Sequence, residues 1–372
     1  MPIPGRAGPN MNNNRGIIGI IEDEVKLRGA VSFARFMELA LYCPNFGYYE
    51  RTEASPGRNG DYFTSVSVGP LFGELLANRF AGWLVAVPDG KRQILEAGAH
   101  DGQLALDMLR RLKTHWPDVL DSLEYWILEP SIRRRQSQEI TLSDFQSRVR
   151  WFESWDALPP DGVRGVIFSN ELLDAMPVHR LGWDAVGGKW FEWGVALEDG
   201  RFVWTKLNMI DPSVPVPVLP NELLAVLPDG FSTEVCPAAT NWWHRAAQTL
   251  RDGKLLAFDY GLAAEEFFTP ERKDGTLRAY YQHHATRDIL ERAGEQDITA
   301  SVNFSAIRYA GESAGLVTET FATQAQFMAD IVAALVNEPR FNEWFAPRSR
   351  QFQTLTHPEH LGQSFRVLVQ GR

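Results

Sequence analysis

The chain has 372 residues, of which 44% are hydrophobic and 12% aromatic, so it can bury the cores of about two or three domain-sized units. Its 37 basic and 47 acidic residues give a formal net charge of −10, which disfavours nucleic-acid and anionic-membrane partners. The two cysteines, Cys43 and Cys236, lie far apart, so we expect neither a disulfide framework nor a thiolate metal site. No apolar run approaches the roughly 20 residues that cross a bilayer, and we predict a soluble, cytoplasmic protein.

The first 90 residues divide into a tail and a cap. Residues 1–15 are rich in Pro, Gly and Asn and are predicted to form a flexible tail. Residues 16–90 are predicted to form a helical cap, in which Ser32 is the N-cap of one helix and Leu71–Leu84 form a second. The long loop between these helices is rich in Gly, Pro and aromatic residues, which is typical of a functional loop.

Residues 91–372 alternate short apolar runs with amphipathic helices, the pattern of a parallel sheet covered on both faces. The predicted strands are Ile94–Ala97, Tyr125–Leu128, Val149–Phe152, Val163–Phe168, Leu255–Phe258, Leu316–Thr320 and Phe365–Val369. We therefore predict an α/β fold, the seven-stranded, doubly wound, Rossmann-like sheet of class I methyltransferases. Insertions are expected at about 181–221, as a β-hairpin with an extended linker, and at about 262–300, as a polar loop.

The first predicted strand ends in an acid, then a turn with a glycine at each end, then a helix. Gly98 and Gly102 allow a sharp turn and close approach of the backbone to a ligand, and the helix N-terminus can bind an anion. Glu129 directly follows the second strand, where a carboxylate can accept both hydroxyls of a ribose. The candidate cofactor-binding residues of this region are Glu96, Gly98, Ala99, His100, Gly102 and Glu129.

The turn has three interpretations. A G-x-x-x-G turn alone is as typical of a plain connection between strand and helix as it is of a ligand-binding turn. A dinucleotide site requires glycines where His100 and Gln103 stand, and Asp101 would face a pyrophosphate. S-adenosylmethionine has no phosphate and carries cationic amino and sulfonium groups, so it suits an acidic turn better. The pattern favours S-adenosylmethionine over NAD, and an NAD-dependent redox enzyme is the weaker alternative.

Several blocks follow one another along the chain. They are L-Y-C-P-N-F-G-Y-Y at Leu41–Tyr49, G-D-Y-F-T-S at Gly60–Ser65, L-F-G-E at Leu71–Glu74, S-N-E-L-L-D-A-M-P-V-H at Ser169–His179, D-Y-G at Asp259–Gly261, G-T-L-R-A at Gly275–Ala279 and D-I-T-A at Asp297–Ala300. In this order they resemble the MidA-like methyltransferases, a family that includes a mitochondrial assembly factor that methylates an arginine of a respiratory complex I subunit. The family's glycine loop usually reads G-P-G-x-G, so His100 replaces its central glycine, and Asn303 stands where the family usually has Asp.

The resemblance implies transfer of a methyl group from S-adenosylmethionine to a protein side chain, with arginine as the acceptor. Glu171 and Asp174 follow the fourth strand, at the sheet edge where ligands bind, and could orient a guanidinium. Asn170 is predicted to position both donor and acceptor. Spacing alone favours a solvated Glu171 and a helix-capping Asp174, and the resemblance reverses that preference. The alternative is a non-catalytic binding or assembly module whose His100 turn has lost the cofactor.

The remaining candidates are single residues. Trp155 follows the third strand and could cover an adenine or simply pack, while Asp61 and Thr64 could hydrogen-bond the donor from the loop above it. His179 and His283 could accept protons, although a lone His beside apolar residues is more often a packing residue. The histidines lack a partnered ligand set, so no metal is expected. Monomer and homodimer both stay open.

Overall fold

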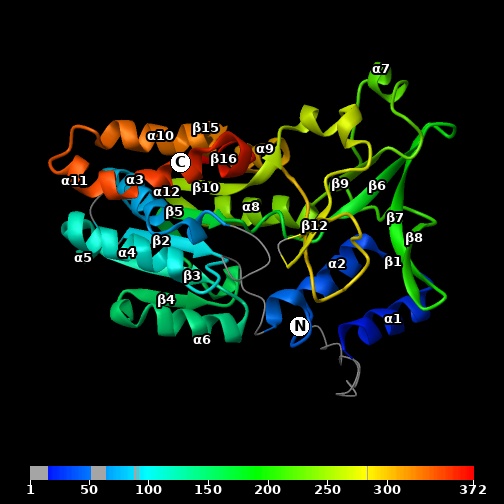
Figure 1. Cartoon of the computed structure of the whole chain (residues 1–372), viewed down its shortest axis with the longest axis horizontal. Coiled ribbons are helices and arrows are strands. Elements are labelled where there is room, and N and C mark those ends of the chain that lie inside the picture. The colour runs from blue at the N-terminus through cyan, green and yellow to red at the C-terminus, as the bar shows by residue number, and fades with distance from the viewer. Residues whose placement is uncertain (1–15, 52–63, 88–89, 91, 283) are drawn as a thin grey trace.

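The computed structural model describes residues 16–51, 64–87, 90, 92–282 and 284–372. The predicted tail of residues 1–15 and the candidates Asp61 and His283 therefore lie outside the described residues. Figure 1 shows a central sheet with helices on both faces and, beside it, a second sheet that is covered by the first two helices.

The central sheet contains all the strands predicted from the apolar runs. Its strands are β2 (Arg92–Ala97), β3 (Leu123–Leu128), β4 (Val149–Phe152), β5 (Val163–Asn170), β10 (Leu250–Leu262), β15 (Val317–Thr323) and β16 (Phe365–Gly371), with β14 (Val302–Asn303) beside β10. The order is β15-β16-β10-β5-β2-β3-β4, and only β16 runs antiparallel to both of its neighbours in this sheet. This order confirms the predicted class I methyltransferase fold.

The inner strands β2, β3, β5, β10 and β16 are largely buried on both faces, which explains their apolar runs, whereas the edge strands β4 and β15 are more exposed. Ile94 and Tyr125 point into the core on one face, whereas Leu95 and Trp126 point into the core on the other. The first face is covered by α3 (Leu71–Ala86), α4 (Gln103–His115), α10 (Gln324–Leu335) and α12 (Ser349–Thr356). The second is covered by α8 (Pro237–Thr249) and α9 (Phe304–Ser313). Further helices are α5 (Pro117–Asp121) and α6 (Ile132–Thr141).

The second sheet is larger than the predicted hairpin. It is five-stranded and antiparallel, with β1 (Val31–Ser32), β6 (His179–Asp184), β7 (Lys189–Glu198), β8 (Arg201–Lys206) and β9 (Ser232–Val235). The hairpin prediction was incomplete because β1 and β9 lie outside the hairpin in the sequence. With two and four residues, these strands are also too short to show an alternating apolar pattern. The stretch of four prolines that we predicted as an extended linker contains no helix or strand, and the short helix α7 (Asn221–Leu224) begins directly after it.

Helices α1 (Ile17–Arg28) and α2 (Phe33–Tyr42) pack against the second sheet. As predicted, Ser32 caps α2, and its hydroxyl accepts the N–H of Arg35 at 3.2 Å. Helix α3 instead packs with α4 against the central sheet. The two helices predicted for the cap therefore lie in different cores, and the domain limits proposed from the sequence stay predictions.

Residues 262–300 are not the polar loop that we predicted. They include a three-stranded antiparallel sheet of β11 (Arg278–Tyr281), β12 (His284–Thr286) and β13 (Asp297–Thr299). Strands of three or four residues are too short to show an alternating pattern, and their pairing joins residues far apart in the sequence. Both cysteines are free thiols.

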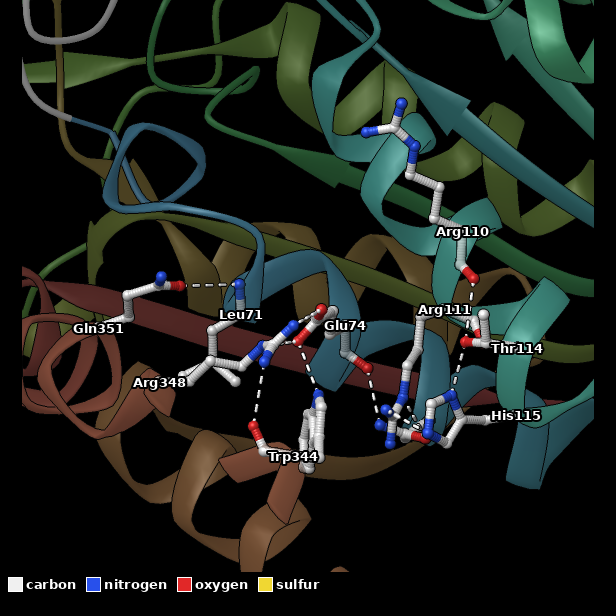
Figure 2. Close-up of polar contacts among 10 residues, drawn as sticks. Leu71, Glu74, Arg110, Arg111, Thr114, His115, Trp344, Arg348 and Gln351 are labelled. Carbon is white, nitrogen blue, oxygen red and sulfur yellow. Dashed lines mark hydrogen bonds and ion pairs between the residues drawn. The ribbon is translucent and has the colours of Figure 1, made fainter. Parts of the chain in front are cut away.

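The L-F-G-E block binds the segment around Trp344 and Arg348 to helix α3 (Figure 2). Glu74 in α3 accepts hydrogen bonds from the Trp344 indole at 2.8 Å and from Arg348 Nη2 at 2.6 Å. Trp344 lies in α11 (Phe341–Phe345), and the Arg111 guanidinium of α4 lies 4.1 Å from the centroid of its ring. Gly73 permits close packing of α3 on α4, because an added Cβ would lie 2.8 Å from Asp107 Cβ. The block therefore connects α3, α4 and the C-terminal helices.

No helix in the described part of the chain is both long and apolar enough to cross a membrane.

Replacing Arg348 with methionine should destabilise the protein by about 1–3 kcal/mol, because it leaves the largely buried Glu74 carboxylate without its cation. The matched control is Lys26→Met, which breaks the more exposed pair with Glu22 and should change the free energy of unfolding by less than about 0.5 kcal/mol. Urea unfolding measures both. Equal losses in the two variants would contradict an anchoring role for Glu74 and Arg348.

Candidate active site

The candidate site lies at the carboxyl edge of the central sheet, between β2 and β5. The chain proceeds from β2 outward to β3 and β4, then returns to place β5 on the other side of β2. Such a switch point opens a crevice at the strand ends, where ligands bind in open α/β sheets. The turn after β2, Glu129 after β3 and the segment Asn170–Asp174 after β5 all meet at this edge.

The turn after β2 has the conformation that its glycines allow. Gly98 has φ +74° and Gly102, the N-cap of α4, has φ +86°. An added Cβ on Gly98 would lie 2.9 Å from Leu172 Cδ1, so the segment after β5 packs directly on the turn. Both the left-handed backbone and this contact require a residue without a side chain. Gly98 therefore lets Leu172 and the segment after β5 pack directly on the turn.

His100 keeps the backbone path of a glycine turn. Its φ is +47°, a left-handed value that glycine adopts more easily. Its carbonyl accepts a hydrogen bond from Gln138 Nε2 at 2.9 Å, and its side chain is 31% exposed. Burial alone would raise the pKa of Asp101, but hydrogen bonds from His100 and from the Gln103 amide lower that pKa below its ordinary value. His100 therefore adds an imidazole side chain to the turn but leaves the left-handed backbone conformation of the turn unchanged.

Gln138 couples the turn to Glu129. Its Nε2 donates to the His100 carbonyl and also to Glu129 Oε2 at 3.2 Å, while its Oε1 accepts the Trp151 indole N–H at 3.0 Å. The Ser131 amide donates to the other Glu129 oxygen at 3.0 Å. Glu129 is only 4% exposed, and burial raises its pKa. The acid therefore stands at the edge where we predicted it, although its bond to a ribose stays a prediction.

Glu96 lies beneath the turn. Its side chain is 2% exposed and accepts the Tyr125 hydroxyl at 2.6 Å, and burial raises the pKa of Glu96 to about 7. Ala99 is also buried, in the core under α3 and α4. These two residues support the turn from inside the protein, and direct contact of either with a cofactor stays a prediction.

Four carboxyl groups gather next to the turn: Glu171, Asp174, Asp259 and Asp297, here called the acid group. Asp259 in β10 is fully buried and accepts the backbone N–H groups of Leu172 at 3.2 Å, Leu173 at 2.8 Å and Tyr260 at 2.9 Å. Burial raises the pKa of Asp259 to about 7 in spite of these donors. Its carboxyl group therefore holds in place the segment that carries Glu171.

Glu171 has an unusual backbone and a shared carboxylate oxygen. Its φ is +52°, and its N–H continues the β5 ladder to Phe258 O at 2.9 Å. Glu171 Oε1 accepts Asn170 Nδ2 at 3.1 Å and the Ser65 N–H at 3.3 Å. Burial and the nearby Asp259 charge raise the pKa of Glu171 to about 8. A non-glycine residue in this strained conformation is typical of a functional site.

The other two members complete the acid group. Asp174 is 6% exposed, and burial together with the charges of Asp259 and Asp297 raises its pKa well above the ordinary value. Asp297 lies in β13 and accepts the Tyr49 hydroxyl at 2.7 Å. The neighbouring Tyr42 hydroxyl donates to Ala175 O at 2.9 Å. The L-Y-C-P-N-F-G-Y-Y block therefore forms the wall of the site that faces the second sheet.

The other candidates make contacts with partners outside the acid group. Thr64 is buried, and its hydroxyl accepts the Ser67 N–H at 3.1 Å in a short turn. Trp155 packs against Trp242 with ring centroids 5.5 Å apart, and its role in covering an adenine stays a prediction. His179 Nδ1 lies 2.6 Å from Glu192 Oε1, which matches the packing role that we weighed for it. No described residues form a group of three that could hold a metal ion.

Sequence reasoning missed two members of the acid group. Asp259 directly follows a predicted buried strand, and its position at the carboxyl end was a usable signal that we did not apply to the site. Asp297 lay in a region that we predicted as a loop, so nothing in the local pattern linked it to Glu171. In the sequence analysis, Asp259 and Asp297 appear only as members of the D-Y-G and D-I-T-A blocks and have no assigned role.

The fold and these groups define a class I methyltransferase. The family model described as "Putative S-adenosyl-L-methionine-dependent methyltransferase" matches residues 75–322, more than half of the chain, and the chain belongs to this family. A Burkholderia thailandensis protein crystallised with S-adenosyl-homocysteine and described as a "likely methyl transferase" is 31% identical. The match covers 100% of this chain and 95% of that one, with a TM-score of 0.80. A native crystal structure of a COG1565 superfamily protein from Burkholderia thailandensis is 30% identical over 100% of this chain and 95% of that one, with a TM-score of 0.78.

Two curated relatives are also similar over most of their length. The mitochondrial protein arginine methyltransferase NDUFAF7 homolog of Drosophila melanogaster is 27% identical over 92% of this chain and 81% of its own. The NDUFAF7 protein of Danio rerio is 25% identical over 95% of this chain and 86% of its own. The resemblance to MidA-like methyltransferases is therefore confirmed, and S-adenosylmethionine, not NAD, is the cofactor.

The residues at this edge fit the methyl donor. The buried carboxyl groups beside the glycine turn suit this cationic ligand, because the donor has a sulfonium and an amino group. One N–H of the α4 N-terminus is already taken, since Gln103 donates to Asp101 Oδ1 at 3.1 Å. The helix therefore offers fewer free donors to a carboxylate than the sequence led us to expect.

Gly98→Ala should weaken the binding of S-adenosylhomocysteine at least about tenfold, because the side chain would strain a φ of +74° and displace Leu172. Calorimetric titration measures the dissociation constant. The control is Gly82→Ala in α3, where an added Cβ meets nothing within 4 Å and binding should not change. Unchanged binding in Gly98→Ala would place the donor elsewhere.

His100→Gly should keep or tighten the binding of S-adenosylhomocysteine, because glycine adopts the left-handed backbone without strain and the carbonyl bond to Gln138 remains. The same titration, with wild type alongside, measures the change in affinity. A loss of binding in this variant would mean that the imidazole itself contacts the donor.

Proposed function

We propose that this chain transfers a methyl group from S-adenosylmethionine to an arginine side chain of a protein substrate. The names of the curated relatives support arginine and a protein as the acceptor. The observation that carries the proposal is the acid group, which places four carboxyl groups beside the donor turn.

A guanidinium is the acceptor that this arrangement suits. It is always charged near neutral pH and presents N–H donors in a planar fork that matches carboxylates. Glu171 Oε1 already accepts two donors, whereas Oε2 has no donor among the described residues. Asp174 stands three residues further along the same segment and is almost fully buried. Together they can orient one guanidinium against the turn that carries the donor.

The chemistry requires alignment and one proton acceptor. S-adenosylmethionine supplies a methyl carbon on a sulfonium. When a guanidinium nitrogen bonds to that carbon, the carbon–sulfur bond breaks, and the methylated guanidinium gives up one N–H proton. Glu171 can accept this proton at Oε2 when its carboxyl group is ionised, and burial, which raises its pKa to about 8 in the protein without a ligand, makes this carboxylate a stronger base than an exposed one. Burial of the site excludes water and strengthens the attraction between the carboxylates and the cation.

The acid group gives the proposal a pH dependence. Without a cation, the raised pKa values of Glu171 and Asp259 mean that the group holds protons at neutral pH. A guanidinium favours the charged carboxylates and lowers these pKa values. Acceptor binding should therefore strengthen as the pH rises through about 7 to 8.

The test uses labelled S-adenosylmethionine, the purified chain and lysate proteins from its own cell, with mass spectrometry to locate methylated residues. We expect methylarginine on a discrete protein, a rate that rises between about pH 6 and pH 9, and a loss of about 100-fold or more in Glu171→Gln. Glu222→Gln on the exposed helix α7 should transfer at the wild-type rate. Asp174→Asn should also reduce transfer.

The outcomes separate the alternatives. Binding of S-adenosylhomocysteine without any methyl transfer would favour the non-catalytic module, and label on another residue type would overturn arginine as the acceptor. The free thiols Cys43 and Cys236 support a reducing compartment such as the cytoplasm. The relatives named above are described as mitochondrial. The homodimer stays a prediction.

A further inference from the structure

A chain of buried hydrogen bonds connects the C-terminal helices to Glu171. Gln324, the first residue of α10, donates from Nε2 to Leu355 O in α12 at 3.0 Å. Its Oε1 accepts the Ser65 hydroxyl at 3.0 Å. The Ser65 N–H then donates to Glu171 Oε1 at 3.3 Å. Residues 65, 171, 324 and 355 are brought together only by the tertiary fold.

The geometry fixes the direction of each bond. Because Gln324 Nε2 meets a backbone carbonyl, the amide cannot be reversed, and Oε1 is left to accept the hydroxyl of Ser65. Gln324, Ser65 and Leu355 have no exposed surface. A buried polar chain with each partner satisfied is rigid, and loss of one member leaves the next without a partner. Ser65 is therefore held firmly at its hydroxyl while its N–H is directed to Glu171.

Glu171 needs such support from outside its own segment. Its left-handed backbone follows the end of β5, and its second donor is the adjacent Asn170, which moves with it. Ser65 comes from a different part of the chain, at the start of the short helix that precedes α3. Both donors meet Oε1, so this oxygen is held by two bonds and Oε2 is left for another partner.

We propose that Gln324 and Ser65 are positioning residues for the Glu171 carboxylate, so that α10 and α12 set the geometry of the methyl-transfer site from a distance. This inference rests on the proposed function for the use that is made of Glu171, but the bond chain itself is independent of it. Both residues are fully buried. Their effect passes through the Ser65 N–H to one carboxylate oxygen.

The bond from the Ser65 N–H to Glu171 can be measured through the pKa of Glu171. The titratable groups that face Glu171 are Asp174 from its own segment, Asp259 and Tyr260 from β10, and Asp297 from β13. Burial and the charge of Asp259 raise the pKa of Glu171, while the bonds from Asn170 and Ser65 lower it. When Ser65 is no longer held, its N–H bond to the carboxylate weakens and the pKa of Glu171 should rise further.

The test reads the titration of Glu171 directly. Protein labelled with ¹³C at the glutamate side-chain carboxyl is titrated by NMR, and the resonance that disappears in Glu171→Gln is assigned to Glu171. We expect a wild-type midpoint near 8 and an upward shift of about one pH unit in Gln324→Met. Ser65→Ala should shift the midpoint in the same direction, and the double variant should add little, because both changes break one chain.

The matched control is Gln370→Met. Gln370 is also a fully buried glutamine, but it bonds Trp243 and Thr318 and takes no part in the Ser65 chain. It should lower the midpoint of urea unfolding without moving the Glu171 titration. If Gln324→Met fails to fold, Ser65→Ala alone decides the result.

Activity provides the second readout. If the wild type methylates arginine, the acid limb of its pH–rate profile should shift upward in Gln324→Met and Ser65→Ala and stay in place in Gln370→Met. An unmoved Glu171 midpoint in the two chain variants would overturn the positioning proposal even if transfer is normal. Absence of transfer in the wild type would overturn the proposed function and leave the NMR result to decide this inference.

Discussion

The site depends on one buried acceptor, the carboxyl group of Asp259. It accepts three backbone N–H groups, two of them from the segment after β5. That segment carries Leu172, which packs on Gly98 of the donor turn, and Glu171, which faces the acceptor side. Because one carboxyl group holds this segment to β10, the donor turn and the acid group keep a constant relation to each other. The open edge of the parallel sheet provides the crevice, and Asp259 decides which groups line it.

The acid group is unfavourable for the protein without a cation. Glu171 and Asp259 have pKa values of about 8 and 7, both raised chiefly by burial. Native carboxyls with raised pKa values bind more protons than the unfolded chain between about pH 4 and pH 8, so their contribution to stability falls as the pH rises through that window. A bound cation reverses this effect by favouring the ionised form. The arrangement therefore sacrifices some stability of the empty protein to gain affinity for a positive ligand.

Several motif blocks hold the site together without forming part of it. The L-F-G-E block ties α3 to Trp344 and Arg348, directly before α12, where the Leu355 carbonyl accepts the bond from Gln324. In the G-T-L-R-A block, Thr276 donates from its N–H to Glu234 Oε2 at 2.7 Å, which connects the small three-stranded sheet to β9. That small sheet carries Asp297 to the acid group. Motifs that mark the family in the sequence are therefore largely the contacts that bring distant segments to one edge.

The sequence by itself determined the elements whose signal is local: the seven central strands, most of the helices that cover them but not α12, the cap at Ser32, and the glycine turn with Glu129 after the next strand. Apolar runs and turn residues are sufficient there, because each element buries its own repeating face. The tertiary structure alone decided the five-stranded second sheet, the short strands between residues 278 and 299, and the joining of Glu171, Asp174, Asp259 and Asp297. The tertiary structure also decided that the Ser65 N–H donates to Glu171 while the Ser65 hydroxyl donates to Gln324. These features rest on pairing and burial between residues more than 100 positions apart in several cases, and no local pattern records which distant partner will meet a buried polar group.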